Sequence, residues 1–319
     1  MTSEDKTGLE IEERGTTLIV RINGGKHALL DPDMAAQLGK LVDKADKDPS
    51  IRAVVFTGAH PDRFLSHADI TWLQEGGVGF PPINTRIAGV VFRTASLINK
   101  LPIVRSLAGM TKLKTLLQLD NLHATFLKMN ASGTIFIAAL NGSALAIGAE
   151  FAWACDVRIM ADGDFVIGLS EVLLALTPGG GGSQRLTRLI GTRQSLAAIL
   201  EGKPFTPAEA LALGAVDEVV PQNKVLERAI ERADYLGLRS KKSLGAIKRS
   251  VYFGGSMSLL KGLQLEHAEF LVRDQSKEAQ RRMLGYVVET EATGELPLLD
   301  RKTYERALSA GRIGSDSNE

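Results

Sequence analysis

Hydrophobic residues recur along the chain with two different periods, and the period predicts the type of element. At residues 33–45 the apolar side chains follow helical spacing, and Asp31-Pro32 before them is a helix start signal. Residues 51–58 form a continuous apolar run, as expected of a buried strand. The same reasoning predicts strands at 9–12, 17–22, 136–140 and 157–160 and a helix at 148–154. This order predicts an α/β fold of repeated strand–strand–helix units rather than an even Rossmann alternation.

Two further regions have a mostly helical pattern. Residues 72–130 are predicted to be helical, with a flexible entry at 76–82. Thr206 is the predicted cap of a helix, and from about Pro207 onward the pattern is almost wholly helical. From about Thr290 the chain is polar, and we expect this tail to be frayed. The predicted apolar stripe of the first of these regions consists of Ile87, Val90, Val91 and Leu97.

Composition and charge narrow the class of protein. The 319 residues are 44% hydrophobic and 24% charged, which is typical of a soluble globular enzyme. The net charge of +1 provides no field that would attract nucleic acid or an anionic membrane, so we expect neither as a partner. A local basic cluster (Arg239, Lys241, Lys242, Lys248 and Arg249) is interpreted either as a solvated helical face or as a site for an anionic ligand tail.

The single cysteine and the first residues predict a cytoplasmic location. Cys155 excludes an intrachain disulfide and fits a reducing compartment. The start of the chain lacks the basic and apolar segments of a secretory signal. The apolar run 135–155 is interrupted by Asn141-Gly142 and contains Glu150, so a strand, a turn and a buried helix explain it better than a membrane span.

The stretch 141–186 contains the candidate chemistry. Glu150 and Glu171 lie among glycine and apolar residues, where an ionised carboxylate loses hydration. Paired carboxylates in such surroundings are typical of proton-transfer catalysts. The glycine run 179–182 lacks the lysine of a phosphate-binding loop and is predicted to be a tight turn that leads into a helix. The five histidines show no metal-ligand spacing, and no metal site is expected.

These motifs resemble a known family. Residues 139–191 are similar to the signature of the crotonase superfamily, whose members include enoyl-CoA hydratases and isomerases. Residues 52–58, 64–70 and 210–221 also resemble that family, and the match covers about 9–72 and 113–290. The resemblance implies a crotonase-like repeated ββα superhelix with a C-terminal helical region. The predicted domains are a core at 1–205 with a helical insertion at about 75–110, a helical region at 206–290 and a polar extension at 291–319.

The resemblance also implies a reaction, the hydration of a 2-enoyl-CoA thioester. The N–H groups of Ala68 and Ile147 would stabilise the negative charge on the thioester oxygen. Glu150 would orient and deprotonate the water that attacks the β-carbon, and Glu171 would bind that water and deliver a proton to the α-carbon. The alternative is that one glutamate is only the ion-pair partner of Arg158 or Arg185.

The family provides the expected ligand and assembly. Coenzyme A arrives on the substrate, so no separate cofactor is implied. Its adenosine diphosphate part would lie near Lys26, His27 and the turn 68–71. Family members usually assemble as homotrimers or dimers of trimers, with C-terminal helices at the contacts. The residues expected to bind coenzyme A are Lys26, His27, Ala68, Asp69, Ile70 and Thr71.

The chain departs from the family pattern at several positions. Ile147 and His67 stand where glycines are common, and we expect Ile147 to disfavour a positive φ and to narrow the pocket. The insertion at 75–110 is longer than usual, and we expect a lid or wall of the acyl pocket or else a subunit contact. The alternatives to a hydratase are an isomerase that needs one acid, an RNA-binding relative and a catalytically inactive scaffold.

Overall fold

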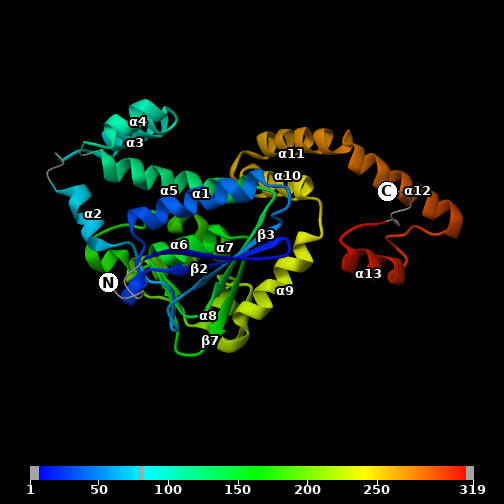
Figure 1. Cartoon of the computed structure of the whole chain (residues 1–319), viewed down its shortest axis with the longest axis horizontal. Helices are drawn as coiled ribbons and strands as arrows, with labels where there is room; N and C mark the ends of the chain where they lie inside the picture. Colours follow the sequence, from blue (N-terminus) through cyan, green and yellow to red (C-terminus); the bar gives the residue numbers. More distant parts are fainter. Residues whose placement is uncertain (1–6, 79–81, 112, 314–319) are drawn as a thin grey trace.

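The computed structural model describes residues 7–78, 82–111 and 113–313, and it contains two sheets surrounded by helices (Figure 1). In the larger sheet the strand order is β1-β2-β3-β5-β7-β9; β1 and β2 are antiparallel and the other neighbours are parallel. The smaller sheet, β4-β6-β8, is parallel throughout. The strands are β1 (Gly8–Arg14), β2 (Thr17–Asn23), β3 (Ala53–Gly58), β4 (Arg63–Leu65), β5 (Ile135–Leu140), β6 (Ser143–Leu145), β7 (Val157–Asp162), β8 (Ile167–Gly168) and β9 (Glu218–Pro221).

Three times, a strand of the larger sheet is followed directly by a strand of the smaller one. These pairs are β3 and β4, β5 and β6, and β7 and β8. The strands β3 and β5 lie side by side in the middle of the larger sheet, and helices cover both of its faces, which explains their continuous apolar sequences. The predicted α/β fold of repeated strand–strand units is confirmed.

The helices pack an aromatic core against the sheets. Phe151 of α6 contacts the rings of Phe56, Phe64 and Phe126, with centroid separations of 4.9, 5.9 and 5.6 Å. Such ring pairs contribute about 0.5–1.5 kcal/mol each beyond the area they bury. This core fixes α6, the helix that carries Glu150. The core helices are α1 (Pro32–Lys47), α5 (Lys114–Ala131), α6 (Ile147–Ala154) and α7 (Gly182–Glu201).

The insertion is helical, as predicted, but its apolar stripe is not buried. Its helices are α2 (Ile70–Gly77), α3 (Thr85–Asn99) and α4 (Pro102–Ala108). The predicted flexible entry overlaps the end of α2, and residues 79–81 lie outside the described part. Asn99 bonds to Asp120 of α5 at 2.7 Å, which fastens α3 to the body. Val90 and Leu97 of the predicted apolar stripe are 58% and 62% exposed, so this chain alone does not cover them.

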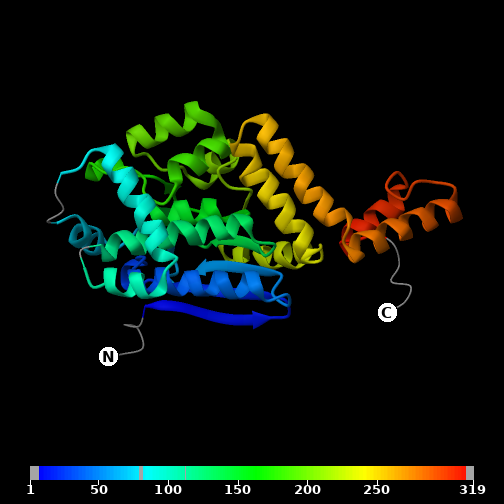
Figure 2. The same cartoon turned by 90° about the horizontal axis from the view of Figure 1, so that it is seen from above.

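The C-terminal region forms an arm beside the body (Figure 2). Our expectation of a frayed tail after about Thr290 is wrong for residues up to 310, because α12 continues to Thr293 and α13 follows it. The N-cap Asp300 accepts a hydrogen bond from Thr303 N–H at 2.8 Å and starts α13. The helices after the core are α8 (Pro207–Leu213), α9 (Val225–Gly237), α10 (Lys241–Tyr252), α11 (Leu259–Asp274), α12 (Lys277–Thr293) and α13 (Arg301–Ala310).

Two cations of the basic cluster at 239–249 point into the protein and not to solvent. Lys241 Nζ donates to the carbonyls of Ala45, Asp48 and Ile51 at 2.6–3.0 Å, next to the C-terminal end of α1. Lys248 is buried and pairs with Asp156 at 2.7 Å. Lys241 and Lys248 thus satisfy carbonyls and a carboxylate inside the protein, and the expected site for an anionic ligand tail stays a prediction.

Candidate active site

The smaller sheet gathers most of the predicted site residues at one edge. Its three strands are parallel, so their carboxyl ends lie on the same side. Ala68 follows β4, Ile147 follows β6 and Glu171 follows β8. Leu145 N–H donates to Ser66 O at 3.1 Å and Ala146 N–H to Gly168 O at 2.9 Å, which holds the three outgoing chains together. The carboxyl edge of parallel strands is where α/β proteins usually bind ligands.

Both predicted amide donors are available. Beside Ala68, the N–H groups of Leu30 and Asp69 bond to His67 O and Leu30 O at 2.9 Å, and Ala68 N–H itself has no acceptor among the described residues. Ile147 is the first residue of α6, and its N–H likewise has no acceptor in that part of the chain. Unbonded N–H groups at a helix start carry partial positive charge and attract a developing anion.

The backbone strain lies one residue earlier than we expected. Ile147 is helical, whereas Ala146 has φ 48° and ψ −120°, a conformation that favours glycine. The concern about positive φ therefore applies to Ala146 and not to Ile147. Gly148 is needed for another reason, because a Cβ there would lie 1.9 Å from Leu65 O. This close approach brings the start of α6 against β4.

Glu150 is held by backbone amides. Its side chain is 1% exposed, and Gly180 N–H donates to both carboxylate oxygens at 2.8 Å while Gly182 N–H donates to Oε1 at 2.7 Å. The pKa of Glu150 is raised to about 7, mainly by burial and partly by the charge of Glu171, while the glycine amides and Arg185 lower it. The charge of Glu171 thus acts on Glu150, which indicates that the two carboxylates lie near each other.

Glu171 has a different setting. It is the first residue of the 3₁₀ helix η3 (Glu171–Leu174) and is half-buried. Burial raises its pKa as well. Its Oε2 is buried and has no hydrogen-bond partner among the described residues. A buried, unsatisfied carboxylate oxygen is costly and is often retained for a catalytic role. The next residues, Leu173 and Leu174, are 72% and 60% exposed.

The alternative role as an ion-pair partner receives no support. Arg158 pairs with Asp217 at 2.7 Å. Arg185 donates to Gly180 O at 3.0 Å and lies over the ring of Phe126, at 5.5 Å from its centroid. Within the described ranges, neither arginine forms an ion pair with Glu150 or Glu171. The charge of Arg185 lowers the pKa of Glu150, but burial has the larger effect and the pKa stays raised.

The residues expected to bind coenzyme A lie close together. Lys26 and His27 are exposed in the 3₁₀ helix η2 (Gly25–His27), and Arg63 donates to Lys26 O at 3.3 Å. The segment after them runs beside the 68–71 turn, since Leu30 bridges to Ala68. Asp69 also caps α2, and accepts from Thr71 N–H at 2.8 Å. Their role in binding remains a prediction.

Two contacts that hold this site in place were not predicted from the sequence. One is the pair of glycine amides on Glu150, which follow it by 30 and 32 residues. The other is His123 of α5, whose Nε2 bonds to Gly179 O and whose ring stacks on Phe92 of α3 with centroids 6.5 Å apart. His123 thus connects the insertion to the glycine turn. A lone histidine on a helix gave no signal of this, because the contact crosses 56 residues.

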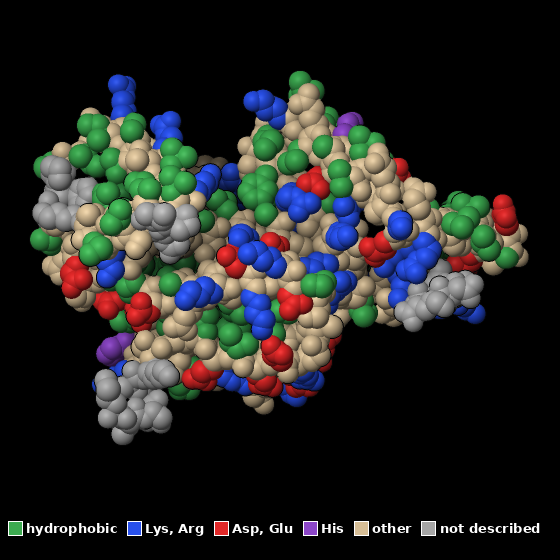
Figure 3. All heavy atoms as spheres, turned by 45° about the horizontal axis from the view of Figure 1, so that its top comes forward, with side chains coloured by type: hydrophobic (Ala, Val, Ile, Leu, Met, Phe, Trp, Pro, Cys, Tyr) green, Lys and Arg blue, Asp and Glu red, His purple; other side chains and the backbone are tan. Residues whose placement is uncertain are grey.

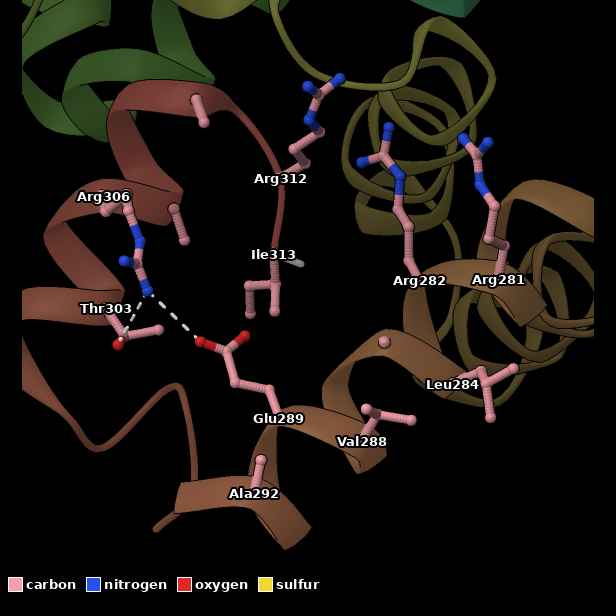
Figure 4. A pocket seen from close by; sticks show the side chains of 13 residues that line it. Arg281, Arg282, Leu284, Val288, Glu289, Ala292, Thr303, Arg306, Arg312 and Ile313 are labelled. Carbon is pink, nitrogen blue, oxygen red and sulfur yellow. Dashed lines mark hydrogen bonds and ion pairs between the residues drawn. The ribbon is translucent and has the colours of Figure 1, made fainter. Parts of the chain in front are cut away.

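A cavity of about 720 Å³ lies away from the two glutamates, between α12 and α13 (Figure 4). Arginines line it, but Arg306 pairs with Glu289 at 3.3 Å and Arg282 with Glu278 at 2.8 Å. Those charges are already compensated within the arm. In the part of the chain with coordinates, no group of three or more His, Cys, Asp or Glu side chains is arranged to hold a metal, and no helix is long and apolar enough to span a membrane.

Comparison with known proteins shows which proteins this chain resembles. A family model described as enoyl-CoA hydratase/isomerase matches residues 106–293. The chain is 29% identical over 317 residues to the fatty acid oxidation complex subunit alpha of Idiomarina loihiensis, covering 97% of this chain and 37% of that protein. It is 30% identical over 235 residues to the protein of the same name from Shewanella sp. ANA-3, covering 73% and 28%. The chain thus spans about a third of the length of these curated relatives.

Two solved structures share the fold along nearly their whole length. The crystal structure of an enoyl-CoA hydratase from Geobacillus kaustophilus has a TM-score of 0.71 and 27% identity, and covers 90% of this chain and 95% of that chain. The enoyl-CoA hydratase of Thermoplasma volcanium has a TM-score of 0.66 and 25% identity, and covers 88% and 97%.

Proposed function

Because the chain belongs to the enoyl-CoA hydratase/isomerase family of the crotonase superfamily, we propose that it adds water across the 2,3 double bond of a 2-enoyl-CoA thioester. The observation that carries this proposal is the pair of buried acids: glycine amides hold Glu150, and Glu171 has a buried Oε2 with no partner among the described residues. The pKa of both is raised. Hydration needs two proton transfers, and a pair of carboxylates that shares one proton provides both.

The amides of Ala68 and Ile147 are proposed to bind the thioester oxygen. When water adds to the β-carbon, the π electrons move to that oxygen and form an enolate. Two fixed N–H donors stabilise this charge without reorganisation, and the start of α6 adds its dipole. Such donors act in the transition state more strongly than in the ground state, which is what accelerates a reaction.

Glu150 is proposed to take the proton from water, and Glu171 to deliver one to the α-carbon. The pair then ends with the proton on Glu150 and returns to its starting state by exchange with solvent. In the free protein the pKa of about 7 favours a proton on Glu150 near neutral pH. The proposed roles therefore require that the proton move to Glu171 when substrate and water bind. Each such transfer contributes roughly 10²–10⁴ in rate.

A second candidate is an enoyl-CoA isomerase with one working acid. The glycine amides occupy both oxygens of Glu150, whereas Glu171 retains an unpartnered oxygen. Under this alternative Glu171 moves the proton between carbons, and Glu150 has a supporting role. The names of the curated relatives make a fatty acyl chain the proposed substrate class for either reaction.

Assembly through the C-terminal helices is part of the same proposal. No residue of α11 or α12 is buried within this chain. Phe270 and Leu271 are 64% and 54% exposed, so these helices present apolar surface that a second copy would cover. We propose a homotrimer or a dimer of trimers. Light scattering of the purified chain tests this, and a monomer at micromolar concentration would contradict it.

The reaction is tested with the purified chain and crotonyl-CoA. Loss of the absorbance of the conjugated enoyl thioester, with formation of 3-hydroxybutyryl-CoA, is expected. A series of longer 2-enoyl-CoA thioesters, compared between the wild type and Ile147→Gly, tests whether Ile147 limits the acyl chain. A 3-enoyl-CoA that yields the conjugated isomer, with no hydration of any 2-enoyl-CoA, would instead support the isomerase.

A further inference from the structure

The charge of this protein is unevenly distributed along the chain. Residues 76–119 contain six Lys and Arg and no Asp or Glu. The rest of the chain has 32 Lys and Arg against 37 Asp and Glu, a net charge of −5. The whole-chain value of +1, from which we expected no membrane partner, therefore conceals one strongly cationic segment. That segment includes α3 and α4.

One face of α3 combines these cations with apolar side chains. Arg86, Val90, Arg93, Leu97 and Lys100 follow one another at spacings of four and three residues, which places them along one side of the helix. All five are exposed, and Val90 and Leu97 are 58% and 62% exposed. The opposite side of α3 faces the body, where Ala95 is 2% exposed.

The apolar surface continues past the end of α3. Apolar side chains gather on the upper left of Figure 3, the part of the molecule where α3 and α4 lie in Figure 1. An exposed apolar area of this extent marks an interaction site. The exposed apolar residues that follow α3 are Leu101 at 54%, Val104 at 42%, Leu107 at 64% and Met110 at 84%.

The cations on this surface have no acidic partners. Arg86, Lys100 and Lys114 form no ion pair with any described residue. Arg93 donates to Gly89 O at 3.2 Å, which leaves its charge uncompensated. The surface is therefore both apolar and electrostatically positive, and its ligand must be apolar and negative.

We propose that α3 and α4 bind the surface of an anionic lipid membrane. Val90 and Leu97 would insert between lipids, while Arg86, Arg93 and Lys100 would extend their charges to the phosphates. The two helices have 15 and 7 residues, so they would lie on the membrane and not cross it.

The composition of this face favours lipid over a second copy of the chain. The core of a protein contact is depleted of charged residues, lysine among them, although arginine is enriched in interfaces as a whole. On α3, cations alternate with apolar residues at each turn, so no purely apolar core is available. In contrast, α11 has exposed apolar residues together with Lys261, Glu266 and Glu269, charges of both signs that suit a protein partner.

The test is sedimentation of the purified full chain with phosphatidylcholine vesicles, with or without phosphatidylglycerol. Binding is expected only to the anionic vesicles and should weaken with added salt. A variant with Arg86→Gln, Arg93→Gln and Lys100→Gln should bind about 100-fold more weakly, because each cation near an anionic surface contributes about fivefold. A second variant, Val90→Ser with Leu97→Ser, keeps all charges and should bind at least about tenfold more weakly.

The matched control removes three exposed cations from a helix elsewhere on the surface. Lys40→Gln, Lys44→Gln and Lys47→Gln on α1 should leave vesicle binding within about twofold. Equal loss in this control and in the α3 variant would overturn the proposal, as would equal binding to neutral vesicles. A wild type that binds no vesicles would also overturn it. If the proposal is overturned and the α3 variant has a different sedimentation coefficient from the wild type without lipid, this face of α3 is a contact between copies of the chain.

Discussion

The two glutamates of the candidate site have opposite kinds of support. Glu150 lies on a helix packed into an aromatic core, and its carboxylate accepts hydrogen bonds from two glycine amides. Glu171 lies on one turn of 3₁₀ helix beside exposed leucines, and one of its oxygens has no described partner. The difference suggests that the first acid is positioned by the fold and that the second waits for a ligand to complete its hydrogen bonds.

The largest expected effect is on catalysis. Glu171→Gln should lower kcat by roughly 10²–10⁴, because it removes the proton donor to the α-carbon. Glu150→Gln should lower kcat for hydration by a similar factor if both acids transfer protons. Steady-state rates with crotonyl-CoA measure both effects. A Glu150→Gln variant with nearly full activity would contradict equal roles and leave Glu171 as the working acid.

The pH profile sharpens the same comparison. Hydration needs one proton on the pair, and burial raises the pKa of Glu150 to about 7. We therefore expect kcat/KM to fall about tenfold per pH unit above that value, because neither acid then has a proton to deliver. Rates from pH 5 to pH 9 measure this. A single-base isomerase that uses ionised Glu171 would show no such decline.

The ionised carboxylate of Glu150 should lower the free energy of unfolding at high pH. Its pKa is raised in the folded state, so its stabilising effect is complete below pH 4.5 and is lost as the pH rises through about 7. At 1.36 kcal/mol per pKa unit, Glu150→Gln should be more stable than the wild type by up to about 3 kcal/mol at pH 8 and by nothing at pH 4. Urea unfolding at both values measures this; Glu171→Gln serves as the comparison.

A smaller effect is expected at the glycine turn. In Gly180→Ala the new Cβ would lie 2.3 Å from Ile147 Cδ1 and 2.5 Å from Glu150 Oε2, so the turn must shift. We expect a loss of about 1–3 kcal/mol in unfolding free energy, together with reduced activity. Gly179→Ala is the matched control, since a Cβ there meets nothing within 4 Å. Similar losses in both variants would show that the contact with Glu150 is not the cause.

The smallest effect is expected at Ala146, the residue before the proposed amide donor Ile147. Ala146→Gly should raise the unfolding free energy by about 1 kcal/mol, because glycine accepts φ 48° without strain. Ala149→Gly, within α6, should have the opposite sign. Thermal unfolding of both variants tests the assignment of strain to Ala146. A destabilised Ala146→Gly would contradict it.

Local pattern was sufficient for much of the fold. The helical spacing after Asp31-Pro32 corresponds to α1, the apolar run at 51–58 to β3, and the cap at Thr206 to α8. The motif order at 139–191 was sufficient to identify the family, although glycines such as Gly148 are required by contacts distant in sequence. The pattern does not say what an apolar stripe faces: Val90 and Leu97 would have the same spacing against a core or against an external ligand.

The hydrogen bonding and burial of Glu150 and Glu171 depend on long-range contacts that no local sequence pattern encodes. The sequence alone identified Glu150 and Glu171 as a pair, but their different hydrogen bonding arises because α7 begins against α6 and brings the amides of 180 and 182 to one acid only. The close approach of α6 to β4 at Gly148 and the positive φ of Ala146 are likewise properties of the fold that the residue types do not reveal. Sequence specifies which side chains are available, whereas burial and long-range backbone contacts set their charge and geometry.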